Sequence, residues 1–209
     1  MPAVSQSRSG WVSFGYAQDR PEWVNLHTGS FSVSTWIRPT ETAGNWQYDG
    51  IFWFQKRGFS QYNWLLVLGT NADSDFNGSL GWYISGTIDT WNWFPSASAP
   101  IVQNQWNHIV YTVSGNISGD RSITAYINGN QLGTPYRQGG GTPTGFSNKN
   151  VTDPLWEIGL GSWFNNGFNF KGQMDDFSVW DIELNSDQVN ALYNGGSGVD
   201  VLTALTQSS

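Results

Sequence analysis

Carboxylates are the first residues in this sequence that could carry chemistry, and few of them lie together. The four glutamates, at positions 22, 41, 157 and 183, are isolated from one another. The one adjacent acidic pair is Asp175-Asp176, and neighbours in an extended strand point to opposite faces. A retaining glycosidase needs two carboxyl groups about 5–5.5 Å apart around the scissile bond. The sequence therefore predicts that this pair does not act as a same-face dyad.

Nucleophilic catalysis has no better candidates. The chain has no cysteine and no Gly-x-Ser-x-Gly elbow, and its two histidines are His27 and His108. His108 lies beside Ile109 inside an expected strand, where a structural imidazole is the favoured interpretation. The glycines at 139–141 lack the Lys-Ser/Thr that follows a phosphate-binding loop. These features predict a protein that is not an enzyme.

A metal site has one candidate. Asp73, Asp75 and Asn77, followed by Gly78, reproduce the first half of a calcium loop, in which oxygen ligands alternate around the ion. The twelfth position is Ile84, where such a loop has a bidentate glutamate. Asp and Asn before glycine also favour an ordinary β-turn. Two interpretations stay open, a Ca²⁺ site and a turn without metal.

Large aromatic residues in polar loops form the candidate ligand site. Sugars present flat C–H faces and hydroxyl edges, which aromatic rings and amides suit. Because the chain has 13 tryptophans, many of them must fill a core, and burial of any one ring is the alternative. The residues predicted to bind a ligand are Trp46, Tyr48, Tyr62, Trp91, Trp93, Trp163, Asn165 and Asn166.

Strands are the elements that must position these residues. The segment 106–113 has apolar or aromatic residues on both faces, 122–127 alternates, and Asn128-Gly129 is a two-residue turn signal. Phe31 to Ile37 alternates as well, and Pro39 ends it. Asn185 to Gln188 has the spacing of a capping box and predicts one short helix through Tyr193. A strand covered on both faces indicates a layered all-β domain.

Three stretches resemble one family. Trp106-x-His-Ile-Val with Ile123-Thr-Ala-Tyr-Ile-Asn-Gly129, then 31–39, then 170–193, are similar to laminin-G-like jelly rolls, a group that includes the pentraxins and shares the concanavalin A-like sandwich. The resemblance implies a two-sheet antiparallel β-sandwich jelly roll with one short C-terminal helix. It implies one domain over residues 1–209, of which 196–209 are a tail. Pentraxins bind calcium next to the closing strand, but residues 162–169 here contain no carboxylate.

The net charge and the hydropathy of the sequence limit the classes of partner that the protein is expected to bind. The net charge of −7 argues against nucleic acid, which rewards clustered Lys and Arg. No apolar run approaches the roughly 20 residues that span a bilayer, and the N-terminus shows no signal peptide, so localisation stays open. We expect a non-enzymatic module for glycan recognition or adhesion. The alternative is a structural or decoration protein that binds protein partners in an oligomer or in a larger assembly such as a phage virion. A glycoside hydrolase is the third and least favoured alternative.

Overall fold

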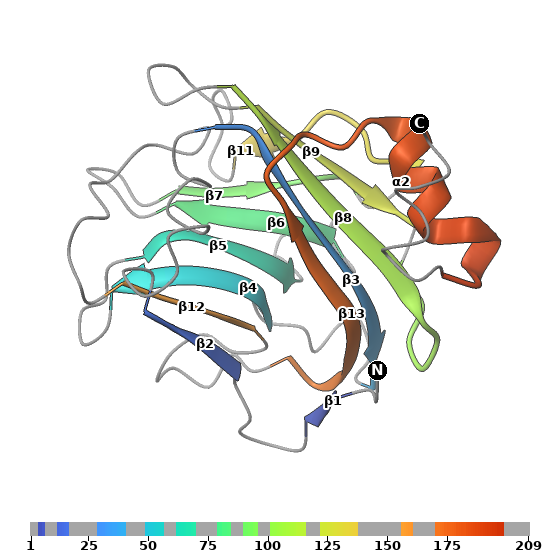
Figure 1. Ribbon diagram of the computed structural model, residues 1–209, viewed down its shortest axis with the longest axis horizontal. Helices are drawn as coiled ribbons and strands as arrows, with labels where there is room; N and C mark the ends of the chain where they lie inside the picture. Colours follow the sequence, from blue (N-terminus) through green and yellow to red (C-terminus); the bar gives the residue numbers. More distant parts are fainter. Residues whose placement is uncertain are drawn as a thin grey trace.

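The computed structural model describes residues 4–6, 12–16, 29–40, 49–56, 62–69, 79–84, 90–95, 101–115, 122–137, 156–160 and 170–198. These segments form two stacked antiparallel sheets, as Figure 1 shows. The all-β sandwich predicted from the sequence is confirmed. In the described part of the chain no helix has the length and apolar character that crossing a membrane requires.

The first sheet has six strands and carries the helix on its outer face (Figure 1). Each strand pairs antiparallel with its neighbours. In spatial order the strands are β1 (Val4–Gln6), β13 (Gly172–Trp180), β3 (Phe31–Pro39), β8 (Asn107–Ser114), β9 (Ser122–Ile127) and β10 (Asn130–Gln131).

The second sheet has seven strands, again all antiparallel. In spatial order they are β11 (Tyr136–Arg137), β7 (Thr90–Trp93), β6 (Ser79–Ile84), β5 (Tyr62–Gly69), β4 (Asp49–Lys56), β12 (Trp156–Leu160) and β2 (Val12–Tyr16).

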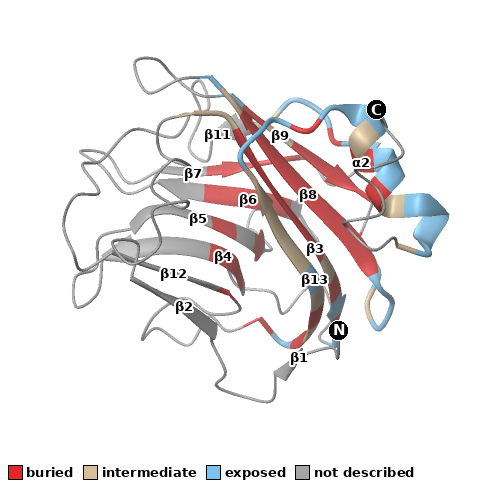
Figure 2. Cartoon of the chain, in the orientation of Figure 1, coloured by how far each residue is buried: buried red, intermediate tan, exposed pale blue. Residues whose placement is uncertain are grey.

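The main core lies between the sheets. On β3 the side chains of Phe31, Val33 and Ile37 are buried there, which confirms the predicted alternation of that strand. The facing sheet contributes Phe52 and Trp82 among others. Figure 2 shows the buried residues running along the strands of both layers. Because apolar burial contributes roughly 25 cal/mol per Å², this layer supplies the main driving force for folding.

A second, smaller core covers the outer face of the six-stranded sheet. The helix α2 (Ser186–Tyr193) packs Val189 and Leu192 against Val110 of β8 and Tyr126 of β9. This contact explains why β8 is buried on both faces, as predicted from its composition. Asn185 is the N-cap of this helix, and its side chain forms the predicted capping box with Gln188. The short 3₁₀ helix η4 (Asn194–Gly196) follows α2.

A β-bulge interrupts β13. Met174 pairs with Ile37 and Asp175 with Trp36, but the next aligned pair is Ser178 with Ser34, so β13 contains one residue more than β3 over this stretch. Asp176 adopts the left-handed region with φ 47°. The bulge lets Met174 pack in the main core while Phe177, further along the strand, packs against the same core.

Candidate functional site

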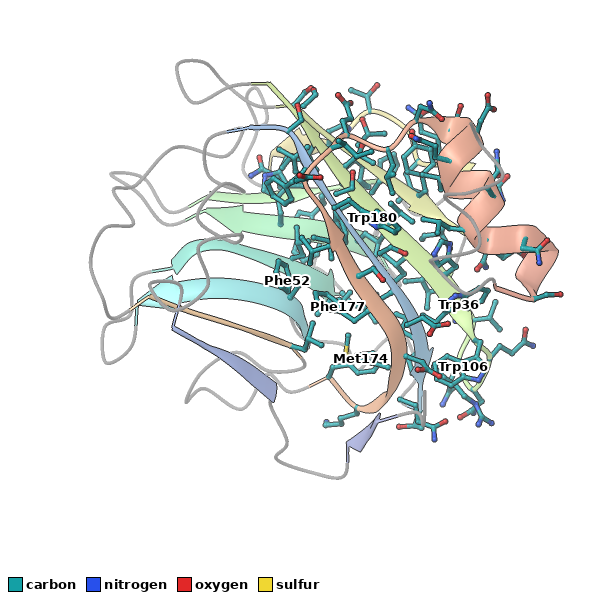
Figure 3. The ribbon with its side chains drawn as sticks, viewed as in Figure 1. Trp36, Phe52, Trp106, Met174, Phe177 and Trp180 are labelled. Carbon is teal, nitrogen blue, oxygen red and sulfur yellow. The ribbon has the colours of Figure 1, made fainter. Side chains whose placement is uncertain are left out.

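A hollow of about 180 Å³ lies on the outer face of the six-stranded sheet. It is bounded by the bulge of β13, by Trp36 of β3, by Trp106 immediately before β8, and by residues 196–198 after α2. Figure 3 shows Trp36 and Trp106 close together on the side of the sheet away from Phe52. The residues lining the hollow are Trp36, Trp106, Asp175, Asp176, Gly196, Ser197 and Gly198.

Trp36 forms one wall because of the alternation of β3. Its neighbours Thr35 and Ile37 are buried, whereas its own indole is half-buried. The indole contacts the ring of His108 on β8 with centroids 5.0 Å apart, and it stacks on Tyr193 of α2 at 5.9 Å and 26°. The rings of His108 and Tyr193 are themselves stacked with centroids 6.2 Å apart, so the three rings form one cluster that holds the Trp36 indole in place.

Trp106 is held by an ordered turn. Asn107, which is buried, donates from Nδ2 to the carbonyl oxygens of Val102 (2.9 Å) and Gln105 (2.8 Å) and accepts from the backbone N–H of Val102 (3.0 Å). Arg38 donates from Nε to the carbonyl of Asn104 at 2.9 Å. These hydrogen bonds order the backbone of the turn, and the Trp106 side chain is 38% exposed, so its ring is accessible.

His108 lies in β8 next to the hollow and is not among its lining residues. The imidazole is 2% exposed, and its Nε2 is 2.9 Å from the hydroxyl oxygen of Ser34. Burial lowers the pKa of His108 from 6.5 to about 4. The ring is therefore neutral at pH 7, and its packing against Trp36 and Tyr193 fits the structural role expected from the sequence.

Asp175 and Asp176 line the same hollow, so the prediction that they point to opposite faces is wrong. Alternation holds only in a regular strand, and the bulge with its left-handed Asp176 breaks it. The Asp175 Oδ1 accepts a hydrogen bond of 2.9 Å from the backbone N–H of Asp176. The spacing of Met174, Phe177 and Val179, three residues and then two, was the sequence signal for this bulge.

The hollow thus combines two indole rings with two carboxylates. Carboxylates accept hydrogen bonds from hydroxyl or ammonium groups, and indole faces attract C–H groups and cations. Among the described residues there is no group of three or more His, Cys, Asp or Glu side chains that could hold a metal ion. Ligand binding is the chemistry that these four side chains can perform together.

Most residues predicted for the ligand site lie elsewhere or outside the described segments. Trp93 is in β7 and is fully buried, with its ring against Gly81, so it offers no exposed surface. Tyr62 and Trp91 belong to β5 and β7, where only their backbone is described. Outside the described residues lie Trp46, Tyr48, Trp163, Asn165 and Asn166, and also Asp73, Asp75 and Asn77 of the calcium hypothesis.

Comparison with known families decides the classification. A model described as the concanavalin A-like lectin/glucanases superfamily matches residues 13–190. The chain belongs to this superfamily. The resemblance drawn from the strands is therefore confirmed, and in this member of the superfamily the hollow lies on the helix-bearing sheet. A comparison with curated proteins found no match.

Solved structures share the superfamily fold with this chain. The CBM40 module of the Ruminococcus gnavus IT-sialidase, bound to α2,3-sialyllactose, has 12% identity over 95% of this chain and 97% of its own, with a TM-score of 0.63. Domain 4 of AbnA, a GH43 extracellular arabinanase from Geobacillus stearothermophilus in complex with arabinotriose, has 19% identity over 90% and 74%, with a TM-score of 0.55. The receptor-binding domain of botulinum neurotoxin mosaic serotype C/D has 18% identity over 93% and 45%, with a TM-score of 0.52.

Proposed function

We propose that the protein is a non-enzymatic carbohydrate-binding module that holds one sugar ring in the hollow. The observation that carries the proposal is that Trp36, Trp106, Asp175 and Asp176 line the same hollow. The C–H face of a pyranose suits an indole, and its hydroxyl groups can donate to the carboxylates. Hydrogen bonds to ionised acceptors are shorter and stronger than neutral ones, so the acids would add orientation as well as affinity.

The size of the hollow supports a ligand of limited extent. Its volume of about 180 Å³ lies below the roughly 300–1,000 Å³ of sites that enclose drug-sized ligands. A single sugar unit, with the rest of the glycan in solvent, fits such a volume better than an enclosed oligosaccharide. Two structures with a similar fold are complexes with oligosaccharides, sialyllactose and arabinotriose, which supports this class of ligand.

The position of the two acids in one bulge favours sugar binding without hydrolysis. Asp175 and Asp176 are consecutive residues of one bulge, so both carboxylates belong to one wall of the hollow. A glycosidase needs its acid and its nucleophile or base on either side of the scissile bond. The remaining residues of the ligand site predicted from the sequence are proposed as a second contact region for a glycan: Trp46, Tyr48, Tyr62, Trp91, Trp163, Asn165 and Asn166.

Calorimetric titration with a panel of mono- and oligosaccharides tests the proposal, using the native chain and Trp106→Ala. Trp106 is 38% exposed, so its removal should leave the fold intact while weakening the binding of a responding sugar about tenfold. Ile182→Ala is the matched control, because Ile182 is also exposed, at 43%, and does not line the hollow. Equal loss in both variants, or no loss in Trp106→Ala, would reject the hollow as the sugar site. Release of reducing sugar from a bound ligand would reject the non-enzymatic assignment.

A further inference from the structure

We infer that the sugar unit held in the hollow carries an N-acetyl group, an inference that rests on the proposed carbohydrate-binding function. Its chemical class is therefore an N-acetylhexosamine. The hollow offers the three contacts that an acetamido group can use: a hydrogen-bond donor, a hydrogen-bond acceptor and an apolar surface. They come from Trp36, Asp175 and Trp106, which all line it.

The indole N–H of Trp36 is the donor. The ring packs against His108 and Tyr193, and within the described segments its N–H has no hydrogen-bond acceptor. Unlike the indole N–H of Trp180, it is not buried, so a ligand in the hollow can reach it. An indole N–H can only donate, and it therefore requires an acceptor atom of the ligand, such as a carbonyl oxygen.

Asp175 supplies the acceptor directly beside this donor. It is the aligned partner of Trp36 in the ladder between β13 and β3. Directly opposed residues on one face of a sheet have Cβ atoms roughly 4.5–5.5 Å apart. The Asp175 Oδ1 already accepts the N–H of Asp176 at 2.9 Å, but a carboxylate has acceptor sites on both oxygens and can accept from a ligand as well. This contact is a hydrogen bond and does not depend on the net charge of the hollow.

Trp106 supplies the apolar surface. Its ring is 38% exposed, and an acetamido methyl can pack on an indole face. The C=O and the N–H of an acetamido group point in opposite directions, so the group can accept from Trp36 and donate to Asp175 at once. A hydroxyl in the same place spans a shorter distance and has no methyl. An ammonium group has no acceptor and would leave the N–H of Trp36 without a partner.

Gly198 keeps the N–H side of the Trp36 indole open. A Cβ at this position would lie 3.5 Å from Nε1 and 3.6 Å from both Cε2 and Cζ2 of Trp36. A side chain at 198 would therefore cover the donor that the inference assigns to the ligand. Gly195 has nearly the same φ, 61° against 62°, but a Cβ there meets nothing within 4 Å, and Gly195 does not line the hollow. Alanine would be similarly strained at both glycines, and only at 198 would it contact Trp36.

The test is calorimetric titration of the full chain with three β-1,4-linked disaccharides that differ only at C2. Diacetylchitobiose carries an acetamido group there, the glucosamine disaccharide an ammonium group and cellobiose a hydroxyl. We expect diacetylchitobiose to bind on the order of tenfold more tightly than either of the others. The pair N-acetylgalactosamine and galactose makes the same comparison for the other configuration at C4.

Two further measurements assign the preference to Trp36. Gly198→Ala should weaken binding of the acetamido sugar about tenfold, to the level of the hydroxyl sugar, whereas Gly195→Ala should keep both the affinity and the preference. In the native chain, which needs no variant to fold, the NMR signal of the Trp36 indole N–H should shift further downfield with the acetamido sugar than with its hydroxyl counterpart.

The outcomes separate this inference from the proposed function. Equal affinity within both sugar sets, or tighter binding of the amine, would overturn the inference and leave carbohydrate binding standing. Equal losses in Gly198→Ala and Gly195→Ala, or a Trp36 signal that does not respond to the acetamido sugar, would also overturn the inference. Failure of every sugar in the wider panel would overturn both.

Discussion

The Asp175 carboxylate accepts a hydrogen bond of 2.9 Å from the backbone N–H of Asp176 at the point where β13 gains its extra residue. Asp and Asn are the non-glycine residues that best tolerate the left-handed region, which Asp176 occupies with φ 47°. The bulge therefore directs two acids into one hollow while Met174 and Phe177 still reach the main core.

Substitutions at Asp176 should separate the effect of backbone strain on stability from the effect of removing the negative charge. Asp176→Val should lower the free energy of unfolding by about 1–2 kcal/mol, because a β-branched residue is strained at positive φ. Asp176→Asn, the matched control, should stay within about 0.5 kcal/mol of the native chain. Urea denaturation of both variants measures the difference. Equal stability of the two variants would show that position 176 does not adopt this backbone conformation.

His108 predicts a pH dependence of stability. Its pKa in the folded chain, about 4, lies below the ordinary 6.5, so the unfolded chain takes up the proton first as the pH falls. The stabilisation is complete above pH 6.5 and is lost progressively between pH 6.5 and about 4, amounting to about 3 kcal/mol. Denaturation of the native chain and His108→Gln across this range isolates the contribution. A pH profile that is the same in both proteins would contradict the burial of a neutral imidazole.

Gly81 should not tolerate a side chain. It pairs with Trp93, and a Cβ at this position would lie 2.5 Å from Cε3 of the Trp93 ring and 2.7 Å from the Asn92 carbonyl oxygen. Since both neighbours are buried, Gly81→Ala should cost about 1–3 kcal/mol of unfolding free energy. Gly29→Ala is the control, because a Cβ there meets nothing within 4 Å, and it should not destabilise the chain. Similar thermal stability of the two variants would count against the register of β6 with β7.

The cap of α2 gives a prediction for the segment beside the hollow. Asn185 accepts a hydrogen bond of 3.0 Å from the backbone N–H of Gln188, whose Oε1 accepts from the N–H of Asn185 at 2.9 Å. Asn185→Ala should therefore lower the unfolding free energy by about 1 kcal/mol, whereas Ser186→Ala, at an exposed neighbour, should have little effect. Chemical denaturation of the two variants measures the difference between their unfolding free energies. No difference between the two variants would show that the capping box contributes nothing to stability.

Local patterns were enough to predict the elements near the site but not the site itself. The alternation of β3 and the capping box at Asn185 depend on neighbours in sequence, so both could be seen in advance. The hollow depends on Trp36 meeting Tyr193, a contact between segments far apart in the chain. The prediction for Asp175 and Asp176 failed because regular alternation was assumed, although the spacing of Met174 and Phe177 indicated an extra residue.

The most direct test of sugar binding in the hollow is an NMR titration of the 13 tryptophan indole N–H signals, assigned by Trp→Phe substitution, with the sugar that binds most tightly. If the hollow is the sugar site, the signals of Trp36 and Trp106 shift together with increasing sugar, and the signal of the buried Trp82 does not. Shifts confined to other tryptophans, with Trp36 and Trp106 unchanged, would show that the sugar binds outside the hollow.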